Sequence, residues 1–397
     1  MNSQNNFSQI DFLYTNIGRG HPFYLDGINE ALLRRGEISL IKSQSDVFEL
    51  SSGISKLIWK LARWLYTNGS SNNTIKKIYE KIRKENDYNR KSIMLGIMGN
   101  SLKKIYSQFD KPVIVAHPLL VAILSNHTNV IYQHGELVVP NEALVRGADY
   151  IIVPTQKVAD RFIDFGYDVN QLFVSGLCIE PAIVRQANDL FTERLLRIEQ
   201  NNKLTGAFFS SGAEPKEHLE QLIACINSSI KEGGRVIVFA RQNGKFEKNI
   251  KKEFNSTGVI YKLIDSQAII PNEISNVSLV SFKNRREENI FTAKLFRHFD
   301  YFVSPSHERT NWAVGLGLPI FTLSPTIGTF SPLNAKFIFD SKVGENIIDI
   351  RFASNFGDWL NSIQNRKKLM IYSQNGWGNY KIDGFNKIAD FLIEFSN

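Results

Sequence analysis

Histidine side chains stand at the ends of apolar segments in four places of this sequence. Seven histidines occur in 397 residues, and four of them follow or end a short run of aliphatic and aromatic residues: His21, His117, His134 and His307. Any one of them alone is more often a structural histidine. Because ligands of open α/β sheets bind beyond the carboxyl ends of the strands, we expect the four to line one crevice. An imidazole exchanges protons near neutral pH, so the pattern predicts acid–base chemistry.

The segment NIGRGHPF places two glycines and an arginine, Gly18, Arg19 and Gly20, directly before His21. Glycines permit an open turn between a strand and a helix, whose backbone N–H groups and helix N-terminus can face a ligand. The alternative is a plain tight turn. We interpret the loop as one wall of a binding site and His21 as a general base at its mouth.

Other chemistries lack their usual sequence patterns. No histidine has another His, Cys or carboxylate in a familiar ligand spacing, so we expect no metal site. A serine hydrolase of the G-x-S-x-G type and a nicotinamide dehydrogenase of the G-x-G-x-x-G type are not indicated either. After Gly18 and Gly20, the place of the third glycine is taken by Phe23, and the next apolar segment ends in Lys42 and Ser43 instead of an acid.

Short apolar segments alternate with helical patterns along most of the chain, which predicts parallel strands covered by crossover helices. Twelve segments are expected to be strands: IDFLYTN, ISLIKS, KPVIVAHP, NVIYQHG, DYIIVPT, QLFVSGL, LTGAFFSSG, RVIVFA, GVIYKLI, VSLVSF, DYFVSPS and LPIFTLSP. Helices are expected at Gln156–Phe165, Lys216–Lys231, Arg286–Phe299 and Asn334–Ile338. The fold class is therefore α/β, with two doubly wound Rossmann-like domains.

The length suggests two domains. We expect an N-terminal domain at residues 1–190 and a C-terminal domain at residues 203–376, joined by a polar helix over residues 182–203. A last helix within residues 377–397 follows a glycine break and is expected to pack back on the first domain.

Positive charge is concentrated in the segment from Lys56 to Lys104. This segment contains twelve Lys or Arg and three acidic residues, so its net charge is +9, whereas that of the whole chain is +8. Within it, SKLIWKLARWLY places apolar residues at helical spacing with cations between them. The segment predicts either an anionic membrane surface as partner or a core helix with a solvated basic face. Nucleic acid is not expected as a partner, because no known binding module is matched.

The sequence indicates a cytoplasmic protein. If the basic segment binds lipid, we expect the protein at the inner face of the membrane. It has no recognisable signal peptide and no apolar stretch long enough to span a bilayer. Its two cysteines, Cys178 and Cys225, lie far apart and suggest reduced thiols.

Four stretches resemble GT-B glycosyltransferases, in particular the branch of the lipid-II-forming N-acetylglucosaminyltransferase and the diacylglycerol glycosyltransferases. NIGRGHPFYLDGINEAL is similar to their glycine-rich loop that ends in histidine, and VIYQHGELVVPNEALVRGADYIIVPTQKVADRF to their strand–His/Glu–helix series. QLFVSGLCIEPAI resembles the exit from their first domain, and FFSSGAEPKEH the opening loop of their second. SPSHERTNWAVGLGLPIFTLSPTIGTFSPLNAKFI resembles their donor signature.

The resemblance implies two domains that face each other across a cleft, and a metal-independent hexosyltransferase that moves a sugar from a nucleotide donor to an acceptor hydroxyl. The nucleotide sugar, with UDP expected, is a substrate, and no cofactor is needed. His21 or Glu136 would take the proton of the acceptor hydroxyl, with His134 beside them, and the acceptor, a sugar or a lipid, would meet Gly18, Arg19, Gly20 and His117. The donor would contact Ser210, Ser211, Gly212, Arg241, Ser306, His307, Glu308, Arg309, Thr310, Asn311 and Asn334.

One position departs from the family pattern. The family commonly has a ribose-binding glutamate five residues before the glycine of its G-L-P motif, and this chain has Trp312 there, preceded by Asn311. Glu308 or Asn311 could substitute for it. Two alternatives to the transferase therefore stay open: a sugar-nucleotide epimerase of the same architecture, and a catalytically inactive binding module.

Overall fold

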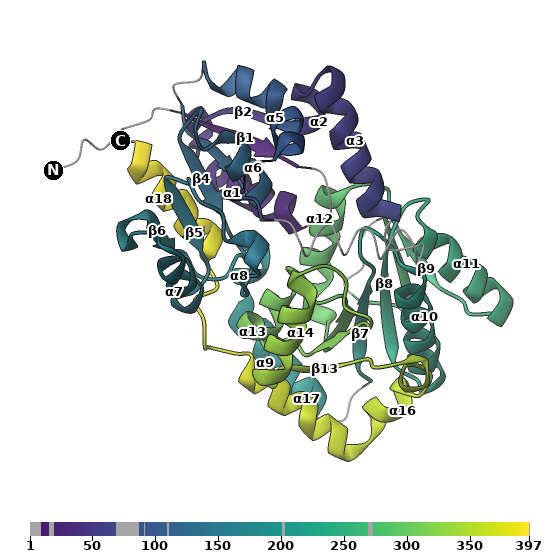
Figure 1. Ribbon diagram of the computed structural model, residues 1–397. Coiled ribbons are helices and arrows are strands. Elements are labelled where there is room, and N and C mark those ends of the chain that lie inside the picture. The colour runs from purple at the N-terminus through teal and green to yellow at the C-terminus, as the bar shows by residue number, and fades with distance from the viewer. Residues whose placement is uncertain are drawn as a thin grey trace. The chain divides into compact units, whose positions relative to one another are not determined.

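The computed structural model describes residues 9–15, 20–68, 87–90, 92–108, 111–200, 203–268 and 273–396. The chain forms two compact units, Met1–Pro181 with Lys381–Asn397, and Ala182–Tyr380 (Figure 1). The second unit begins where the sequence indicated one long joining helix. The structure divides this segment into α8 (Pro181–Val184) and α9 (Ala187–Glu199).

The first unit is built on a six-stranded parallel sheet with the strand order β2-β1-β3-β4-β5-β6. Nearly every residue of its four central strands is buried, because helices cover both faces of the sheet. The strands are β1 (Ile10–Tyr14), β2 (Ile41–Asp46), β3 (Val113–Val115), β4 (Val130–Gln133), β5 (Tyr150–Val153) and β6 (Leu172–Val174).

The last helix of the chain, α18 (Gly384–Ser396), packs on α1 (Gly20–Arg34), at the other end of the sequence. Arg35 forms an ion pair of 2.8 Å with Asp390 and donates hydrogen bonds to Asn386. The other helices of the first unit are α2 (Val47–Leu50), α3 (Gly53–Asn68), α5 (Ile93–Tyr106), α6 (Pro118–Leu124) and α7 (Gln156–Phe165).

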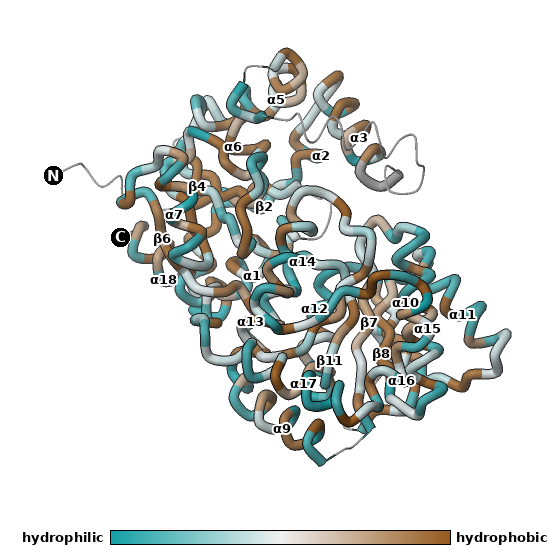
Figure 2. The backbone as a smooth tube through the Cα atoms, turned by 60° about the horizontal axis from the view of Figure 1, so that its bottom comes forward, coloured by the Kyte–Doolittle hydropathy of each residue, from teal (hydrophilic) through white to brown (hydrophobic). Residues whose placement is uncertain are grey.

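The second unit holds a seven-stranded parallel sheet with the order β13-β12-β11-β7-β8-β10-β9. Its central strands are apolar, and β7 and β8 are brown along much of their length in Figure 2. The strands are β7 (Thr205–Phe209), β8 (Arg235–Arg241), β9 (Lys262–Ile264), β10 (Val277–Phe282), β11 (Tyr301–Ser304), β12 (Ile320–Thr322) and β13 (Gly344–Asn346).

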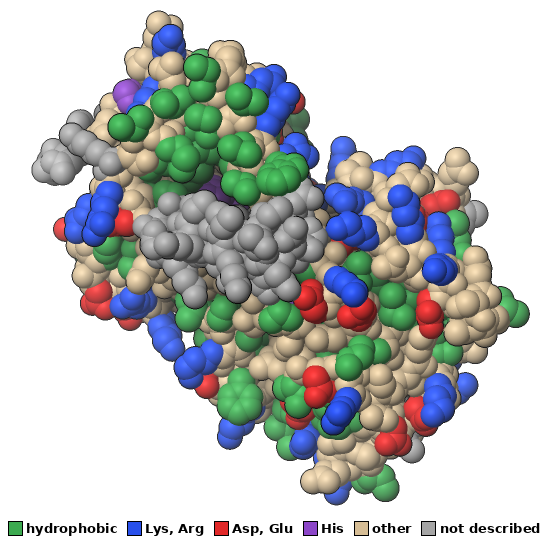
Figure 3. Space-filling view, turned by 45° about the vertical axis from the view of Figure 1, so that its right-hand side comes forward, with side chains coloured by type: hydrophobic (Ala, Val, Ile, Leu, Met, Phe, Trp, Pro, Cys, Tyr) green, Lys and Arg blue, Asp and Glu red, His purple; other side chains and the backbone are tan. Residues whose placement is uncertain are grey.

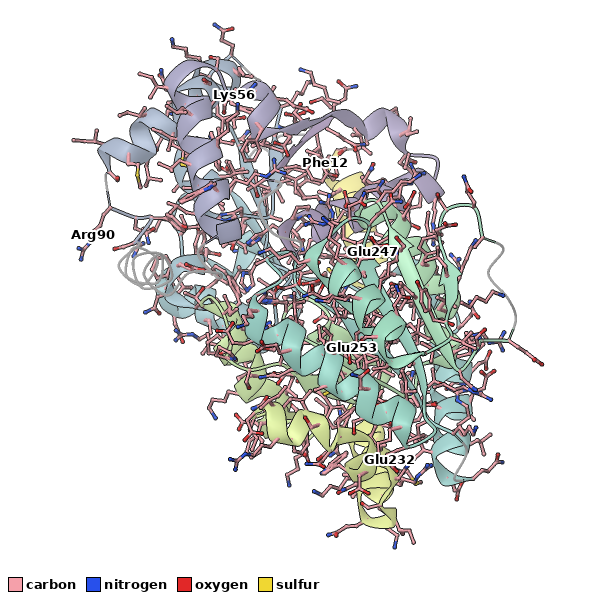
Figure 4. The ribbon with its side chains drawn as sticks, turned by 90° about the vertical axis from the view of Figure 1, so that its right-hand side faces the viewer. Phe12, Lys56, Arg90, Glu232, Glu247 and Glu253 are labelled. Atoms are coloured by element: carbon pink, nitrogen blue, oxygen red, sulfur yellow. The ribbon has the colours of Figure 1, made fainter. Side chains whose placement is uncertain are left out.

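Two carboxylates of α11 (Lys245–Thr257) attach this helix to the strand β10 and to the helix α10 (Lys216–Lys231). Glu247 of α11 accepts hydrogen bonds from Asn243 N (2.7 Å) and Ser281 Oγ (2.6 Å), whereas Glu253 of the same helix bonds Asn227 (Figure 4). The remaining helices are α10 (Lys216–Lys231), α11 (Lys245–Thr257), α12 (Arg285–Leu295), α13 (Thr310–Leu316), α14 (Phe330–Asp340), α15 (Ile350–Ser354), α16 (Phe356–Asn361) and α17 (Ile363–Asn375).

The predicted α/β fold class, with two parallel doubly wound sheets, is confirmed. Each of the twelve segments expected to be strands overlaps a strand, and two expected helices coincide with α7 and α10. The edge strand β13 was not predicted, because its sequence Gly-Glu-Asn carries no apolar pattern. The expected helix at Asn334–Ile338 is longer, and extends over the whole of α14.

Candidate functional site

Both sheets reverse the direction of their strand order beside their first strand, and ligands of open α/β sheets bind beyond the strands at such points. In the first unit the reversal lies between β1 and β3, because β2 is on one side and β4 to β6 are on the other. In the second unit it lies between β7 and β11.

Two of the predicted histidines meet at the reversal point of the first sheet. His21 lies in the first turn of α1, after β1, and His117 is the N-cap of α6, after β3. Their ring centroids are 4.4 Å apart and the rings are tilted by 46°. Both side chains are half-buried, so they keep access to solvent.

Backbone contacts give the two imidazoles complementary protonation patterns in their neutral forms. Nδ1 of His21 lies 2.6 Å from the carbonyl oxygen of Ala116, which can only accept a hydrogen bond, so Nδ1 carries the proton and Nε2 is the acceptor. In His117, Nδ1 accepts a hydrogen bond of 3.1 Å from Leu119 N, so the proton lies on Nε2. The pair therefore contains one proton acceptor and one proton donor.

The third predicted histidine of this unit, His134, has a different environment. It is 2% exposed, its Nε2 lies 3.1 Å from Val138 O and its Nδ1 lies 3.3 Å from Tyr132 Oη. Burial, reinforced by the nearby His21, lowers the pKa of His134 to about 3. The imidazole is thus neutral at physiological pH, and its environment favours a structural role over the predicted catalytic one.

The other predicted residues of this edge are only partly described. Gly18 and Arg19 lie outside the described residues, whereas Gly20 is the first residue of α1. Glu136 is half-buried in the loop after β4, close to His134. The preceding Gly135 allows a close approach, since a Cβ atom there would lie 2.2 Å from the ring of Tyr24.

At the reversal point of the second sheet, the loop after β7 carries the predicted Ser210, Ser211 and Gly212. The two serines are half-buried, and Gly212 is exposed with open space where a Cβ atom would be. Glu214 closes the loop with a left-handed backbone (φ 47°), and its carboxylate accepts a hydrogen bond of 2.7 Å from Lys245 N at the start of α11. Arg241 is exposed at the end of the neighbouring strand β8.

The segment after β11 is buried and held by α14. Ser306 donates a hydrogen bond of 2.9 Å to Ser331 O, and Asn334 donates one of 3.2 Å to Ser306 O. Thr310 is 1% exposed, and its Oγ1 has no hydrogen-bond partner within the described part of the chain. The neighbouring Asn311 is also buried, and His307 is half-buried.

Arg309, expected to contact a diphosphate, is 5% exposed and points into the protein. Its guanidinium forms ion pairs with Glu288 and, at 3.8 Å, with Glu308, and it lies 4.2 Å from the ring centroid of Phe209. Two carboxylates already face this cation, so its geometry fits a residue that positions the loop and not one that meets a ligand directly. Glu288 was not predicted because it belongs to no motif, and Glu214 was not singled out although it lies within FFSSGAEPKEH.

The described residues contain no group of three or more His, Cys, Asp or Glu side chains able to hold a metal ion. Among the helices of the described ranges, none is long and apolar enough to cross a membrane.

No protein-family model matches the sequence. No curated protein matches it either.

Solved structures match the fold along nearly the whole chain. MnaA of S. aureus with UDP covers 96% of this chain and 94% of its own, with 12% identity and a TM-score of 0.55. UDP-GlcNAc 2-epimerase of Neisseria meningitidis bound to UDP-GlcNAc covers 97% and 98%, with 13% identity and a TM-score of 0.56. The Methanocaldococcus jannaschii UDP-GlcNAc 2-epimerase, solved with UDP-GlcNAc and UDP, covers 97% and 99%, with 13% identity and a TM-score of 0.50.

These matches confirm the GT-B-like architecture of two α/β units. They also correct the expected activity. Two of these three structures are named UDP-GlcNAc 2-epimerases, and this finding overturns the prediction of a hexosyltransferase. The predicted branch of lipid-linked sugar transferases is not confirmed.

Proposed function

We propose that this chain is a nucleotide-sugar epimerase that acts on a UDP-linked sugar. Two findings support the proposal: the match along both units to UDP-GlcNAc 2-epimerases solved with UDP-GlcNAc, in one case also with UDP, and the His21–His117 pair. The pair carries the argument, because inversion of a carbon that bears hydrogen needs one group to remove a proton and another to supply one. A neutral His21 accepts at Nε2, and a neutral His117 donates from Nε2.

Inversion breaks a C–H bond on one face of the sugar ring and forms a new C–H bond on the other. We assign removal of the proton to His21, and its replacement to His117 after the unsaturated sugar has turned over, because two rings with centroids 4.4 Å apart lie too close together to stand on opposite faces of one sugar ring. If the inverted carbon is next to the carbon that bears UDP, the electron pair of the C–H bond forms a C=C bond while the C–O bond to UDP breaks. UDP leaves with the electrons of that C–O bond. Return of UDP, with a proton delivered to the opposite face, restores a UDP-sugar and consumes no oxidant or reductant.

We assign recognition of UDP to the reversal point of the second sheet. Ser210, Ser211 and Gly212 offer hydroxyl and backbone N–H groups, and Arg241 offers an exposed cation at the next strand. The buried Oγ1 of Thr310, which lacks a partner in the described residues, supplies a further polar contact. Such groups stabilise negative charge on a diphosphate as it leaves. Arg309 is assigned a positioning role through Glu288 and Phe209.

We also propose that the enzyme works in the cytoplasm. The two cysteines, Cys178 and Cys225, are buried thiols and not a disulfide. Burial raises the pKa of both thiols, so they stay protonated and are poor nucleophiles. This chemistry suits a reducing compartment.

The test is incubation of the purified chain with UDP-GlcNAc in deuterated water, followed by proton NMR. We expect a second UDP-sugar that carries deuterium at the inverted carbon. His21→Asn and His117→Asn should each lower the rate by about 10²–10⁴-fold. His127→Asn is the matched control, because His127 lies in the same unit but belongs to the loop after α6, and it should leave the rate unchanged.

Two outcomes of this experiment would contradict parts of the proposal. UDP binding without conversion of any UDP-sugar, and without deuterium uptake, would favour the inactive binding module. Conversion that survives both histidine substitutions would leave the epimerase in place and refute the assignment of the acid–base pair.

A further inference from the structure

Helix α3 presents an apolar stripe to solvent. Ile54 (69% exposed), Leu57, Leu61 and Trp64 (50%) are spaced by three, four and three residues, so they lie along one side of the helix. Single exposed apolar residues are ordinary, but four on one helical face are not.

The opposite side of α3 is fixed to the unit. Trp59 is fully buried and donates a hydrogen bond of 3.1 Å from Nε1 to Met98 O on α5. Ser55 donates from Oγ to the same carbonyl at 2.5 Å. The exposed stripe is therefore the outer face of a packed helix and not a core face that lacks its neighbours.

Helix α5, which packs beside α3, continues the exposed surface. Its first five residues include three exposed apolar side chains, Ile93 (85%), Met94 and Ile97. We call these three residues together with the stripe of α3 the apolar face. Figure 3 shows hydrophobic side chains gathered on this part of the first unit, with Lys and Arg side chains at the margin.

Cations accompany the apolar face. Helix α3 carries Lys56, Lys60 and Arg63, helix α5 carries Lys103 and Lys104, and neither helix contains a carboxylate. Lys60, Arg63 and Lys104 are exposed, and Lys56 lies on the outer helix in Figure 4. The surface thus combines exposed aliphatic side chains, a half-exposed tryptophan and positive charge.

We propose that the apolar face docks on an anionic lipid bilayer. A helix with this composition lies in the plane of the interface, with its apolar side chains among the acyl chains, its tryptophan at the headgroup level and its cations against the headgroups. A second copy of this chain fits less well, because a two-fold contact would bring the five cations of one copy against those of the other. The described helices include none able to span the bilayer, so contact from the surface is the mode that the structure supports.

The test is sedimentation of the full chain with vesicles of phosphatidylcholine alone or mixed with phosphatidylglycerol. We expect binding to the anionic vesicles, weakened by salt. Lys60→Glu with Arg63→Glu should weaken it by at least about fivefold per position, the effect of one interfacial charge. The matched control is Lys248→Glu with Lys252→Glu, two exposed lysines on α11 of the other unit, which should bind as the wild type does.

The apolar contribution is tested separately. Leu57→Ser with Leu61→Ser should abolish sedimentation, whereas Phe339→Ser, at an exposed apolar residue of α14, should not. Brominated lipids should quench the wild-type fluorescence and quench Trp64→Phe markedly less. Circular dichroism and urea unfolding show that each variant is folded.

Absence of wild-type binding to anionic vesicles would overturn the proposal. So would a dimer in solution that the Leu57→Ser, Leu61→Ser variant dissociates, because the occupant would then be a second copy. Loss of epimerase activity has no bearing on these outcomes, since no residue of the apolar face belongs to the proposed site.

Discussion

The acid–base pair depends on two contacts between side chain and backbone. The carbonyl of Ala116 fixes the proton of His21 on Nδ1, and the N–H of Leu119 keeps the lone pair of His117 on Nδ1. Ala116 lies in the turn after β3 and Leu119 in the first turn of α6, so one β3–α6 junction sets both tautomers.

At the residue scale, His134 should make folding pH-dependent. Burial lowers its pKa from 6.5 to about 3, so below pH 6.5 the unfolded chain binds a proton that the folded chain excludes, and stability falls as the pH falls. Between pH 6.5 and pH 5, the low pKa of His134 should lower the free energy of unfolding by about 2 kcal/mol. Urea unfolding at pH 7 and pH 5 checks this: the wild type should lose more stability than His134→Gln, and equal losses would contradict the prediction.

The buried ion pair of Arg309 should be sensitive to loss of one partner. Glu288→Gln leaves a buried guanidinium with less compensation, which typically costs about 3–5 kcal/mol. Glu220→Gln, which removes a carboxylate from the exposed pair with Lys216 at 3.6 Å, should cost about 0–1 kcal/mol. Urea unfolding of both variants measures the contrast, and similar losses would show that the buried pair is not needed.

The sequence predicted which histidines end strands, because strand ends and residue types are both visible in it. The direction in which Arg309 points was not predictable, since its partner Glu288 lies 21 residues away on another helix. The burial of His134 escaped notice for a similar reason. Its loop folds over it, and Val138 O and Tyr132 Oη take up its two nitrogens.

At the element scale, the contact between α1 and α18 should reverse the usual effect of a helical alanine. Glycine inside a helix normally costs about 0.5–1 kcal/mol relative to alanine. At Gly27, however, a Cβ atom would lie 2.2 Å from the ring of Phe385, so Gly27→Ala should destabilise the first unit.

The control for this substitution is Gly96→Ala in α5. A Cβ atom there has nothing within 4 Å, so the substitution should stabilise the protein by the ordinary amount. Urea unfolding measures the change in the free energy of unfolding for both variants. If Gly27→Ala stabilised the protein, the close contact between α1 and α18 would be refuted.

Elements were predictable where apolar residues cluster. All seven residues of β11 and β12, which belong to the expected strands DYFVSPS and LPIFTLSP, are buried, and the two strands lie side by side in the sheet. Edge strands were less visible. The segment ISLIKS predicted a strand from Ile38, but Ile38–Leu40 form a short 3-10 helix and β2 begins at Ile41. One face of β2 is only half-buried, so its apolar pattern is weak.

At the scale of the whole molecule, the chain crosses between its two units twice, at Pro181–Ala182 and at Tyr380–Lys381. Residues 381–397 complete the first unit although they follow the whole of the second in sequence. The length suggested two domains, and the glycine break before the last helix suggested that this helix packs back on the first; in the structure α18 packs on α1, and the first unit is discontinuous.

This division into two units predicts which segments UDP should protect from hydrogen exchange. Under our assignment UDP binds the second unit, so hydrogen exchange with UDP present should slow in the loop after β7 and in the segment after β11, residues 210–215 and 305–309. At a UDP concentration of 100 Kd, linkage stabilises the state that binds it by about 2.7 kcal/mol. The control is uridine, which lacks the diphosphate and should protect these loops less. Protection confined to the edge around His21 and His117, or none with binding intact, would place UDP elsewhere and refute the assignment to β7 and β11.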